Sequence, residues 1–315
     1  MRYIGIDLGG TKIAAGLTDE NGHLIMKDSV PTRKEREYPE IIADMAALCE
    51  RLIERDGIKT TDVKSIGIGC PGTPDTKNGV IVYANNIRFR NVPVAAEMRR
   101  HLDIPVIVDN DGNCAALAES VAGAAKDAAH SITITLGTGI GGGFIIDNKI
   151  YSGFNFAAPE VGHMAIIVDG EQCSCGRRGC WEAYASATAL INQTITAARW
   201  DSNSLINELT GGDLNRIDAK TAFDAARKGD EAGIRVVGQY IVYLAEGITN
   251  LINLFSPEVF AIGGGVSNEG EYLLKPLREH VKKGVYSREE IPQTFITAAS
   301  MGNDAGIVGA AMLGL

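Results

Sequence analysis

An internal repeat constrains the fold of this chain more than any other feature of its sequence. The segment YIGIDLGGTKIAAGLTDENGHLI (Tyr3–Ile25) aligns, at an offset of 128 residues, with SITITLGTGIGGGFIIDNKIYSG (Ser131–Gly153). Both segments read as a strand, a glycine turn, a second strand, a polar turn and a third strand. Any two β-hairpins share part of this pattern. A glycine turn in the same register nevertheless favours duplication of one β-rich unit.

The remainder of the chain alternates helical and strand-like patterns. Helices are predicted over Tyr38–Arg55, Cys114–Ala124, Ala183–Arg199, Ala219–Lys228, Glu231–Phe255 and Tyr272–Lys283, with a last helix from about Asp304. Strands are predicted over Lys64–Gly69, Pro105–Val108, Glu258–Gly264 and Thr294–Ala298. Such alternation predicts an α/β architecture with largely covered sheets. We expect the main domain boundary near residues 110–125, and the last helix should return to the first domain.

The charge of the chain excludes some classes of partner. Its 315 residues carry a net charge of −9, whereas nucleic acids and anionic membranes are bound by basic surfaces. The most apolar long segment, Tyr240–Phe255, contains Glu246, Asn250 and Asn253 and therefore reads as a buried helix. The first residues enter a strand at once. We expect no targeting segment, no membrane or nucleic-acid partner, and a cytoplasmic location.

Glycine is unusually frequent and is clustered. The chain has 37 glycines, above the usual ~7% of residues, and they gather in Asp7–Thr11, Leu136–Gly143 and Ile262–Val266. Each cluster directly follows a strand-like run. A glycine turn between strands exposes backbone N–H groups that bind phosphate oxygens. The pattern therefore predicts a polyphosphate held by two related turns.

Side chains beside these turns complete the expected phosphate site. Thr11 and Thr138 add hydroxyl donors, and Asp7 is placed to hold Mg²⁺ through water. The chain has neither the lysine-bearing G-x-x-x-x-G-K-[ST] loop nor a G-x-G-x-x-G that opens a helix after the first strand. The nucleotide therefore has to be bound by a different architecture from those two.

A polar group lies between the strand Pro105–Val108 and the following helix. It comprises Asp109, Asn110, Asp111 and Asn113, at a place where ligands collect in open α/β sheets. One of these residues is expected to cap the helix, for which Asp111 and Asn113 are candidates. Three further polar groups exceed what a cap needs. A carboxylate beside an amide suits binding a hydroxyl group and accepting its proton.

A cysteine-rich segment, EVGHMAIIVDGEQCSCGRRGCWE, brings together potential metal ligands. It contains His163, Cys173, Cys175 and Cys180, and nitrogen and thiolate sulfur are the usual ligands of tetrahedral zinc. The spacing matches no common zinc module. A disulfide or unrelated thiols are the alternatives, but Cys173 and Cys175 are too close in sequence to pair comfortably. We expect a structural metal site.

The order of these motifs resembles the ROK family (repressors, open reading frames and sugar kinases) of the actin-like ATPase superfamily. The matching segments are DLGGTK, LGTGIGGG, NDGNCAA, EVGH, CSCGRRGCWE and IGGGV, and they span nearly the whole chain. The similarity is greatest to bacterial ATP-dependent glucokinases. It implies a duplicated actin-like (ribonuclease H-like) α/β fold, with two domains and a cleft between them. Residues 1–115 and about 302–315 would form the smaller domain, and residues 116–301 the larger one.

The resemblance also implies roles for individual residues. Asp111 matches the catalytic base, and the implied sugar contacts are Asn86, Asn110, Asp111, Glu160, His163 and Glu182. The implied ATP contacts are Asp7, Gly9, Gly10, Thr11, Lys12, Gly137, Thr138 and Gly139, with Gly263, Gly264 and Gly265 on the adenosine side. The implied zinc ligands are His163, Cys173, Cys175 and Cys180. His163 would bind zinc with one ring nitrogen and the sugar with the other, so that the zinc orders the loop.

The implied activity is ATP- and Mg²⁺-dependent phosphorylation of a hexose, with glucose to glucose 6-phosphate as the first expectation. Mannose, fructose, N-acetylglucosamine and N-acetylmannosamine stay open as acceptors. A sugar-sensing repressor is a rival, but the first phosphate strand begins at Tyr3 and leaves no room for a preceding DNA-binding domain. A zinc-ordered binding module without catalysis would not need Asp111. The family also implies a homodimer. Pro159 and Asn85 depart from the family pattern near the expected sugar contacts.

Overall fold

The computed structural model describes residues 1–287 and 290–315, which divide into two compact units. Unit 1 comprises Met1–Thr133, Gly143–Pro159 and Ser300–Leu315, and unit 2 comprises Ile134–Gly142 and Glu160–Ala299. The domain boundary expected at 115/116 stays a prediction. Unit 1 extends beyond it because helix α3 (Asp111–Ala122) packs with the C-terminal helix α10 (Ala305–Met312) around Tyr3 and Ala118.

Unit 1 is built on a five-stranded sheet of order β3-β2-β1-β4-β8. Its strands are β1 (Arg2–Leu8), β2 (Lys12–Thr18), β3 (Leu24–Pro31), β4 (Val63–Cys70) and β8 (Val106–Asn110). Strand β1 pairs antiparallel with β2 and parallel with β4, and β4 pairs parallel with β8. The carboxyl ends of three parallel strands therefore lie at one edge, where ligands bind in open α/β sheets.

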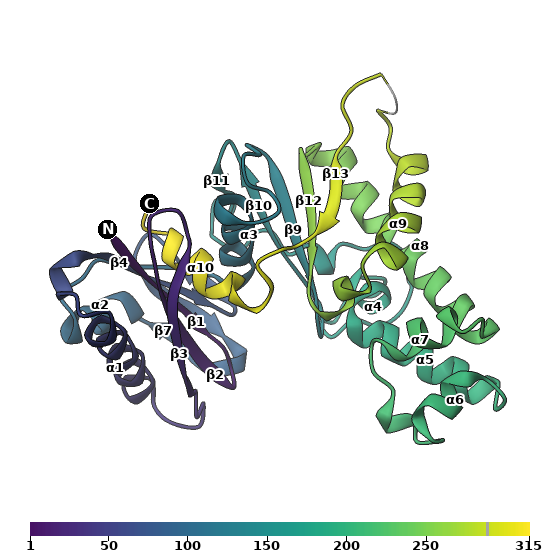
Figure 1. The fold of residues 1–315 in the computed structure, drawn as a ribbon, viewed down its shortest axis with the longest axis horizontal. Coiled ribbons are helices and arrows are strands. Elements are labelled where there is room, and N and C mark those ends of the chain that lie inside the picture. Colours follow the sequence, from purple (N-terminus) through teal and green to yellow (C-terminus); the bar gives the residue numbers. More distant parts are fainter. Residues whose placement is uncertain (288–289) are drawn as a thin grey trace. The chain divides into compact units, whose positions relative to one another are not determined.

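The two faces of this sheet carry different helices because side chains alternate along a strand. Ile4 and Ile6 join the main core with helices α1 (Tyr38–Asp56) and α2 (Val94–His101). Gly5 on β1 and Gly67 on β4 face α10 (Figure 1). A β-carbon would lie 1.8 Å from the carbonyl oxygen of Ile307 at the first position and 1.7 Å from a helix carbonyl at the second. Only glycine permits this approach of helix to sheet.

A second five-stranded sheet has the order β11-β10-β9-β12-β13. Its strands are β9 (Ser131–Leu136), β10 (Ile140–Ile146), β11 (Lys149–Ile150), β12 (Val259–Gly263) and β13 (Phe295–Ala298). Position by position, this order repeats that of the first sheet, with β9, β10 and β11 in the places of β1, β2 and β3. The duplication predicted from the aligned segments is confirmed.

A three-stranded sheet was not expected from the sequence. It comprises β5 (Thr73–Asp75), β6 (Val80–Ala84) and β7 (Phe89–Val92) in the order β5-β6-β7. The strands are three to five residues long, so their hydrophobic alternation is too short to read. This sheet positions Asn86, which lies in the short 3₁₀ helix Asn85–Ile87 between β6 and β7.

Six helices are described in unit 2. They are α4 (Glu182–Ala185), α5 (Ala187–Trp200), α6 (Leu205–Thr210), α7 (Thr221–Arg227), α8 (Glu231–Phe255) and α9 (Glu271–Gly284). The prediction of one helix over Ala183–Arg199 was wrong at a single point. Ser186 interrupts it and caps α5, its Oγ accepting the backbone N–H of Ala189 at 3.0 Å.

Within residues 1–287 and 290–315, no helix is long and apolar enough to cross a membrane.

Candidate functional site

The first glycine turn is a tight connection between β1 and β2. The backbone N–H of Gly9 donates to the carbonyl oxygen of Lys12 at 3.1 Å, and the hydroxyl of Thr32 donates to the carbonyl oxygen of Gly9 at 2.6 Å. Thr11 and Lys12 are exposed. A β-carbon on Gly10 would lie 3.2 Å from the carbonyl oxygen of Asn86. The turn thus presents open backbone beside the expected sugar contact.

Asp7 lies on β1 directly before this turn. Burial raises the pKa of its carboxyl group, and the charge of Lys12 partly offsets that rise. A bound cation would favour the charged carboxylate in the same way. Mg²⁺ keeps several waters and uses one or two protein carboxylates plus phosphate oxygens, so a single carboxylate at the edge of the turn fits it.

The strand-to-helix junction at the end of β8 carries the polar group predicted from the sequence. Asn110 caps α3: its side-chain oxygen accepts the backbone N–H groups of Gly112 at 2.8 Å and Asn113 at 3.3 Å. Its side-chain nitrogen donates to the carbonyl oxygen of Gly72 at 3.0 Å. Asp111 and Asn113 were the expected caps, and that expectation was wrong. Because an amide has two N–H donors, one N–H of Asn110 is left for a ligand.

Asp111 is the first residue of α3 and is exposed. Its carboxylate accepts the backbone N–H of Gly112 at 2.9 Å. The positive end of the helix dipole favours a carboxylate at this position. Asp109, two residues earlier, is buried and bonded to the side-chain nitrogen of Asn113 at 2.9 Å, and burial raises its pKa. Of these two carboxylates, Asp111 is the exposed one and Asp109 the buried one.

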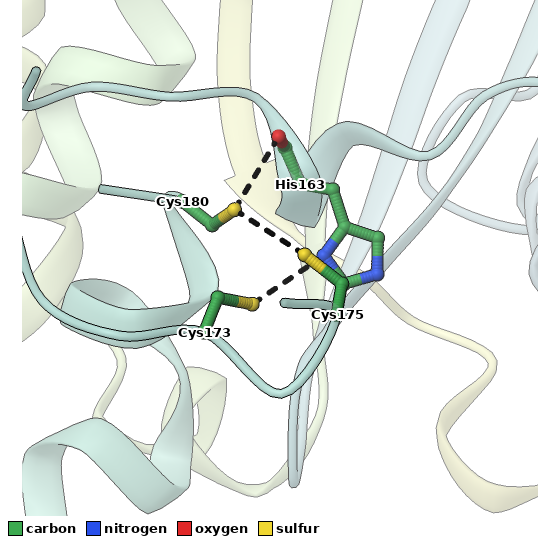
Figure 2. A group of neighbouring side chains, drawn as sticks. All are labelled: His163, Cys173, Cys175 and Cys180. Carbon is green, nitrogen blue, oxygen red and sulfur yellow. Dashed lines mark hydrogen bonds between the residues drawn. The ribbon is translucent and has the colours of Figure 1, made fainter. Parts of the chain in front are cut away.

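The four predicted metal ligands come together in unit 2. The ligand atoms of His163, Cys173, Cys175 and Cys180 all lie within 4.8 Å of one another (Figure 2). The Sγ atoms of Cys175 and Cys180 are 3.7 Å apart, as are Cys173 Sγ and His163 Nδ1. A tetrahedron with Zn–S bonds of about 2.3 Å has S–S edges of about 3.8 Å. The residues therefore fit a four-coordinate zinc ion.

The loop around these ligands is shaped by glycine. Gly179 has φ +80°, and a β-carbon there would lie 1.7 Å from the carbonyl oxygen of Ile167. The following residues anchor the loop, because Trp181 is fully buried and its indole N–H donates to the carbonyl oxygen of Tyr243 on α8 at 2.9 Å. Packing thus holds one side of the metal site in place.

The expected sugar ligands of unit 2 flank the metal site. Glu160 precedes the short 3₁₀ helix Val161–His163, and its carbonyl oxygen accepts the backbone N–H of His163 at 3.1 Å. His163 presents Nδ1 to the sulfur atoms, and its second ring nitrogen is directed away from them (Figure 2). Glu182 Oε1 accepts from the thiol of Cys173 at 3.2 Å. Glu160 therefore lies at one end of the metal loop and Glu182 at the other.

Glu182 also contacts the second glycine turn, which the sequence did not indicate. Its Oε2 lies 3.4 Å from the backbone nitrogen of Ile140, and a β-carbon on Gly139 would lie 2.3 Å from the same oxygen. Gly139 and Glu182 are therefore in contact range, although they are far apart in the sequence. Gly137, in contrast, has open space at the β-carbon position.

The third glycine cluster follows β12. Gly264 has φ +88°, and a β-carbon there would lie 2.2 Å from the carbonyl oxygen of Leu136, at the end of β9. The hydroxyl of Ser267 donates to the carbonyl oxygen of Gly264 at 2.7 Å. The turn Gly263–Gly265 therefore packs directly against the strand that leads into Gly137. Both expected ATP segments of unit 2 belong to one continuous patch of backbone.

The family model for the ROK family matches residues 3–315. The chain belongs to the ROK family. It is 36% identical to the glucokinase of Streptomyces coelicolor over 313 residues, covering 98% of this chain and 96% of that protein. It is 30% identical to the N-acetyl-D-glucosamine kinase of Vibrio cholerae serotype O1 over 323 residues, covering 99% of each.

A solved ROK structure is also similar over nearly the full length. It is a glucokinase from Streptomyces griseus in complex with glucose and AMPPNP, with a TM-score of 0.81, 36% identity and 99% of each chain covered. With the matching order of the two sheets, this similarity confirms the predicted duplicated actin-like α/β fold.

Two contributions to this ROK site were missed at the level of sequence. Gly72, in the turn after β4, accepts the amide of Asn110, and Thr32 holds the first glycine turn. A Pro-Gly pair at residues 71–72 signals a turn but not its partner.

Unit 2 also contains a cavity of about 1070 Å³, lined by Thr138, Cys173, Ser174, Glu182 and residues of α5 and α8. It opens beside both Glu182 and the second glycine turn.

Proposed function

We propose that this ROK protein is an ATP-dependent hexose kinase that transfers the γ-phosphoryl group of ATP to the primary hydroxyl of glucose. The position of Asp111 carries the proposal, because it is an exposed carboxylate at the start of a helix and at the carboxyl edge of parallel strands. Identity of 36% to a glucokinase over 98% of the chain supports this acceptor.

In the proposed reaction, Asp111 accepts the proton of the sugar hydroxyl as the new P–O bond forms. The remaining N–H of Asn110 and the side chain of Asn86 are proposed sugar contacts. Glu160, Glu182 and the second ring nitrogen of His163 are the others. Asp7 would hold Mg²⁺ through water, and the ion would supply charge neutralisation on the phosphates. The backbone N–H groups of the two glycine turns hold the phosphate oxygens.

The metal is proposed to be a structural zinc held by His163, Cys173, Cys175 and Cys180. Four protein ligands at tetrahedral separations support this role, because a catalytic zinc keeps one position open for water or substrate. The zinc would fix the tautomer of His163 and the position of the loop between Glu160 and Glu182. A homodimeric state and a cytoplasmic location are further parts of this proposal.

A coupled ADP-release assay over a panel of sugars tests the acceptor. Glucose should give the highest kcat/KM among glucose, mannose, fructose, N-acetylglucosamine and N-acetylmannosamine. Asp111→Asn should lower kcat by about 10²-fold or more, since an amide binds the hydroxyl but takes no proton. Calorimetric glucose affinity should stay within a few-fold. Asp103→Asn, an exposed position outside the site, is the control. Near-normal turnover in Asp111→Asn would refute the base assignment, and preference for an N-acetylhexosamine would refute glucose.

A further inference from the structure

A buried carboxylate lies just after the third glycine turn. Glu269 ends the 3₁₀ helix Gly265–Glu269, and only 3% of its side chain is exposed. A buried charge needs a partner, because removing it from water without one is costly. The partner is Arg227, the last residue of α7, whose guanidinium makes a short contact with the carboxylate.

Arg227 is itself held by two aromatic rings. Its guanidinium carbon lies 4.8 Å from the ring centre of Tyr272 on α9 and 6.0 Å from that of Phe223 on α7. The two rings meet edge to face, with centres 6.1 Å apart. A planar guanidinium packs on aromatic faces and forms directional bonds in a way that lysine does not. Arg227 therefore ties α7, α9 and the 3₁₀ helix into one arrangement.

This arrangement is coupled to the nucleotide side of the site through a short stretch of backbone. Ser267, two residues before Glu269, bonds to Gly264 through its hydroxyl at 2.7 Å. Gly264 in turn packs against Leu136, which precedes Gly137. The pair Arg227–Glu269 is therefore placed to set the position of the turn Gly263–Gly265 without contacting a ligand there.

We propose that Arg227 and Glu269 are positioning residues for nucleotide binding: the ion pair between the partly exposed guanidinium of Arg227 and the buried carboxylate of Glu269 fixes the Gly263–Gly265 turn against the adenosine side of ATP. The proposal rests on the proposed kinase function and adds to it the residues that hold the nucleotide turn in place. It requires that loss of the pair weakens nucleotide binding selectively, with sugar binding largely retained.

The test is the affinity of purified Arg227→Gln for AMPPNP, measured by calorimetry beside its affinity for glucose. The expected result is a rise of at least about 10-fold in Kd for the nucleotide, with glucose affinity within about 2-fold, where 10-fold corresponds to ~1.4 kcal/mol. Arg227→Lys should recover only part of this loss, because it keeps the charge and loses the planar group. Arg100→Gln is the matched control, since that exposed arginine pairs with Glu97 on α2, outside the site.

A double variant separates positioning from stability. Arg227→Met with Glu269→Met removes both charges, so thermal stability should recover relative to the single variant while nucleotide affinity stays low. If Arg227→Gln fails to fold, this double variant and Arg227→Lys carry the measurement. Unchanged nucleotide affinity in folded variants, or equal losses of nucleotide and glucose affinity, would overturn the proposal. AMPPNP binding is read without turnover, so failure of glucose as the acceptor would be recognised separately.

Discussion

At the scale of single residues, the junction between β8 and α3 carries four polar side chains, and that of Asp111 is exposed. The pattern did not show that Asn110 caps α3, because Asn and Asp are nearly equal cap formers and differ by one position along the chain. Side-chain direction at a strand-to-helix junction depends on the backbone, and composition does not encode it.

Asn110 caps α3 with its side-chain oxygen and has its side-chain N–H groups for Gly72 and a ligand. Two substitutions can separate these roles. Asn110→Ala should lower the stability of the protein by about 1 kcal/mol through loss of the cap, and it should weaken glucose binding as well. Asn110→Asp keeps a capping oxygen and should retain near-native stability while losing the N–H donors to Gly72 and to the sugar. Thermal melts and glucose titrations on both variants check this. Native glucose affinity in Asn110→Asp would exclude Asn110 as a sugar contact.

At the scale of elements, the glycine turns were predictable and their neighbours were not. A strand, a glycine run and a second strand define each turn locally. The contact between Gly139 and Glu182 joins residues 43 positions apart in the chain, and a single sequence carries no signal for it. The same limit explains the break at Ser186, where local propensity favours one continuous helix and a cap interrupts it.

Two substitutions in one turn should therefore have different effects. Gly139→Ala places a methyl group 2.3 Å from the present position of Glu182 Oε2, so it should raise KM for glucose as well as for ATP. Gly137→Ala meets nothing within 4 Å and should affect only the nucleotide. Steady-state kinetics with each substrate varied in turn distinguishes the two. An unchanged KM for glucose in Gly139→Ala would show that Glu182 moves away freely or does not bind the sugar.

The metal loop gives a second prediction at this scale. Purified protein should contain about one zinc per chain, because four protein ligands hold it tightly. Cys175→Ser should lower the zinc content and weaken glucose binding. His163→Ala should weaken glucose binding further, since it removes a ligand and the free ring nitrogen together. Metal analysis and glucose calorimetry on both variants check this, with Cys49→Ser, a buried thiol of α1, as a control for cysteine loss. Full glucose affinity in a zinc-free variant would contradict the ordering role.

At the scale of the whole molecule, duplication was the most reliable prediction. One offset of 128 residues between two segments anticipated two sheets with the same strand order. The three-stranded sheet β5-β6-β7 and helix α6 were missed because each is short and lacks a readable period. The segment Ser300–Leu315 completes unit 1 although it is far from the rest of that unit in the sequence, and such an association depends on tertiary packing.

Glu119 holds the C-terminal segment in unit 1 by hydrogen bonds to its backbone. It lies on α3, is 1% exposed, and its carboxylate accepts the backbone N–H groups of Ala124 at 2.7 Å, Ser300 at 2.9 Å and Met301 at 2.8 Å. Glu119→Ala leaves these donors buried without an acceptor, so stability should fall by about 3 kcal/mol or more. Thermal and denaturant unfolding check this against Glu54→Ala, an exposed position on α1. A loss equal to that of the control would mean that water replaces the carboxylate.

The packing of α10 on Gly5 and Gly67 also has a consequence for biosynthesis. Strand β1 is synthesised long before residues 305–312, which form the helix that covers one of its faces. Between these two events, the nascent chain has to carry an uncovered sheet face next to Tyr3 while all of unit 2 is made. Unit 1 therefore completes its fold only late in translation, after unit 2 has had time to form. Exposed apolar surface on the partly made chain is what chaperones bind, so synthesis of this protein should depend on them more than its final stability suggests.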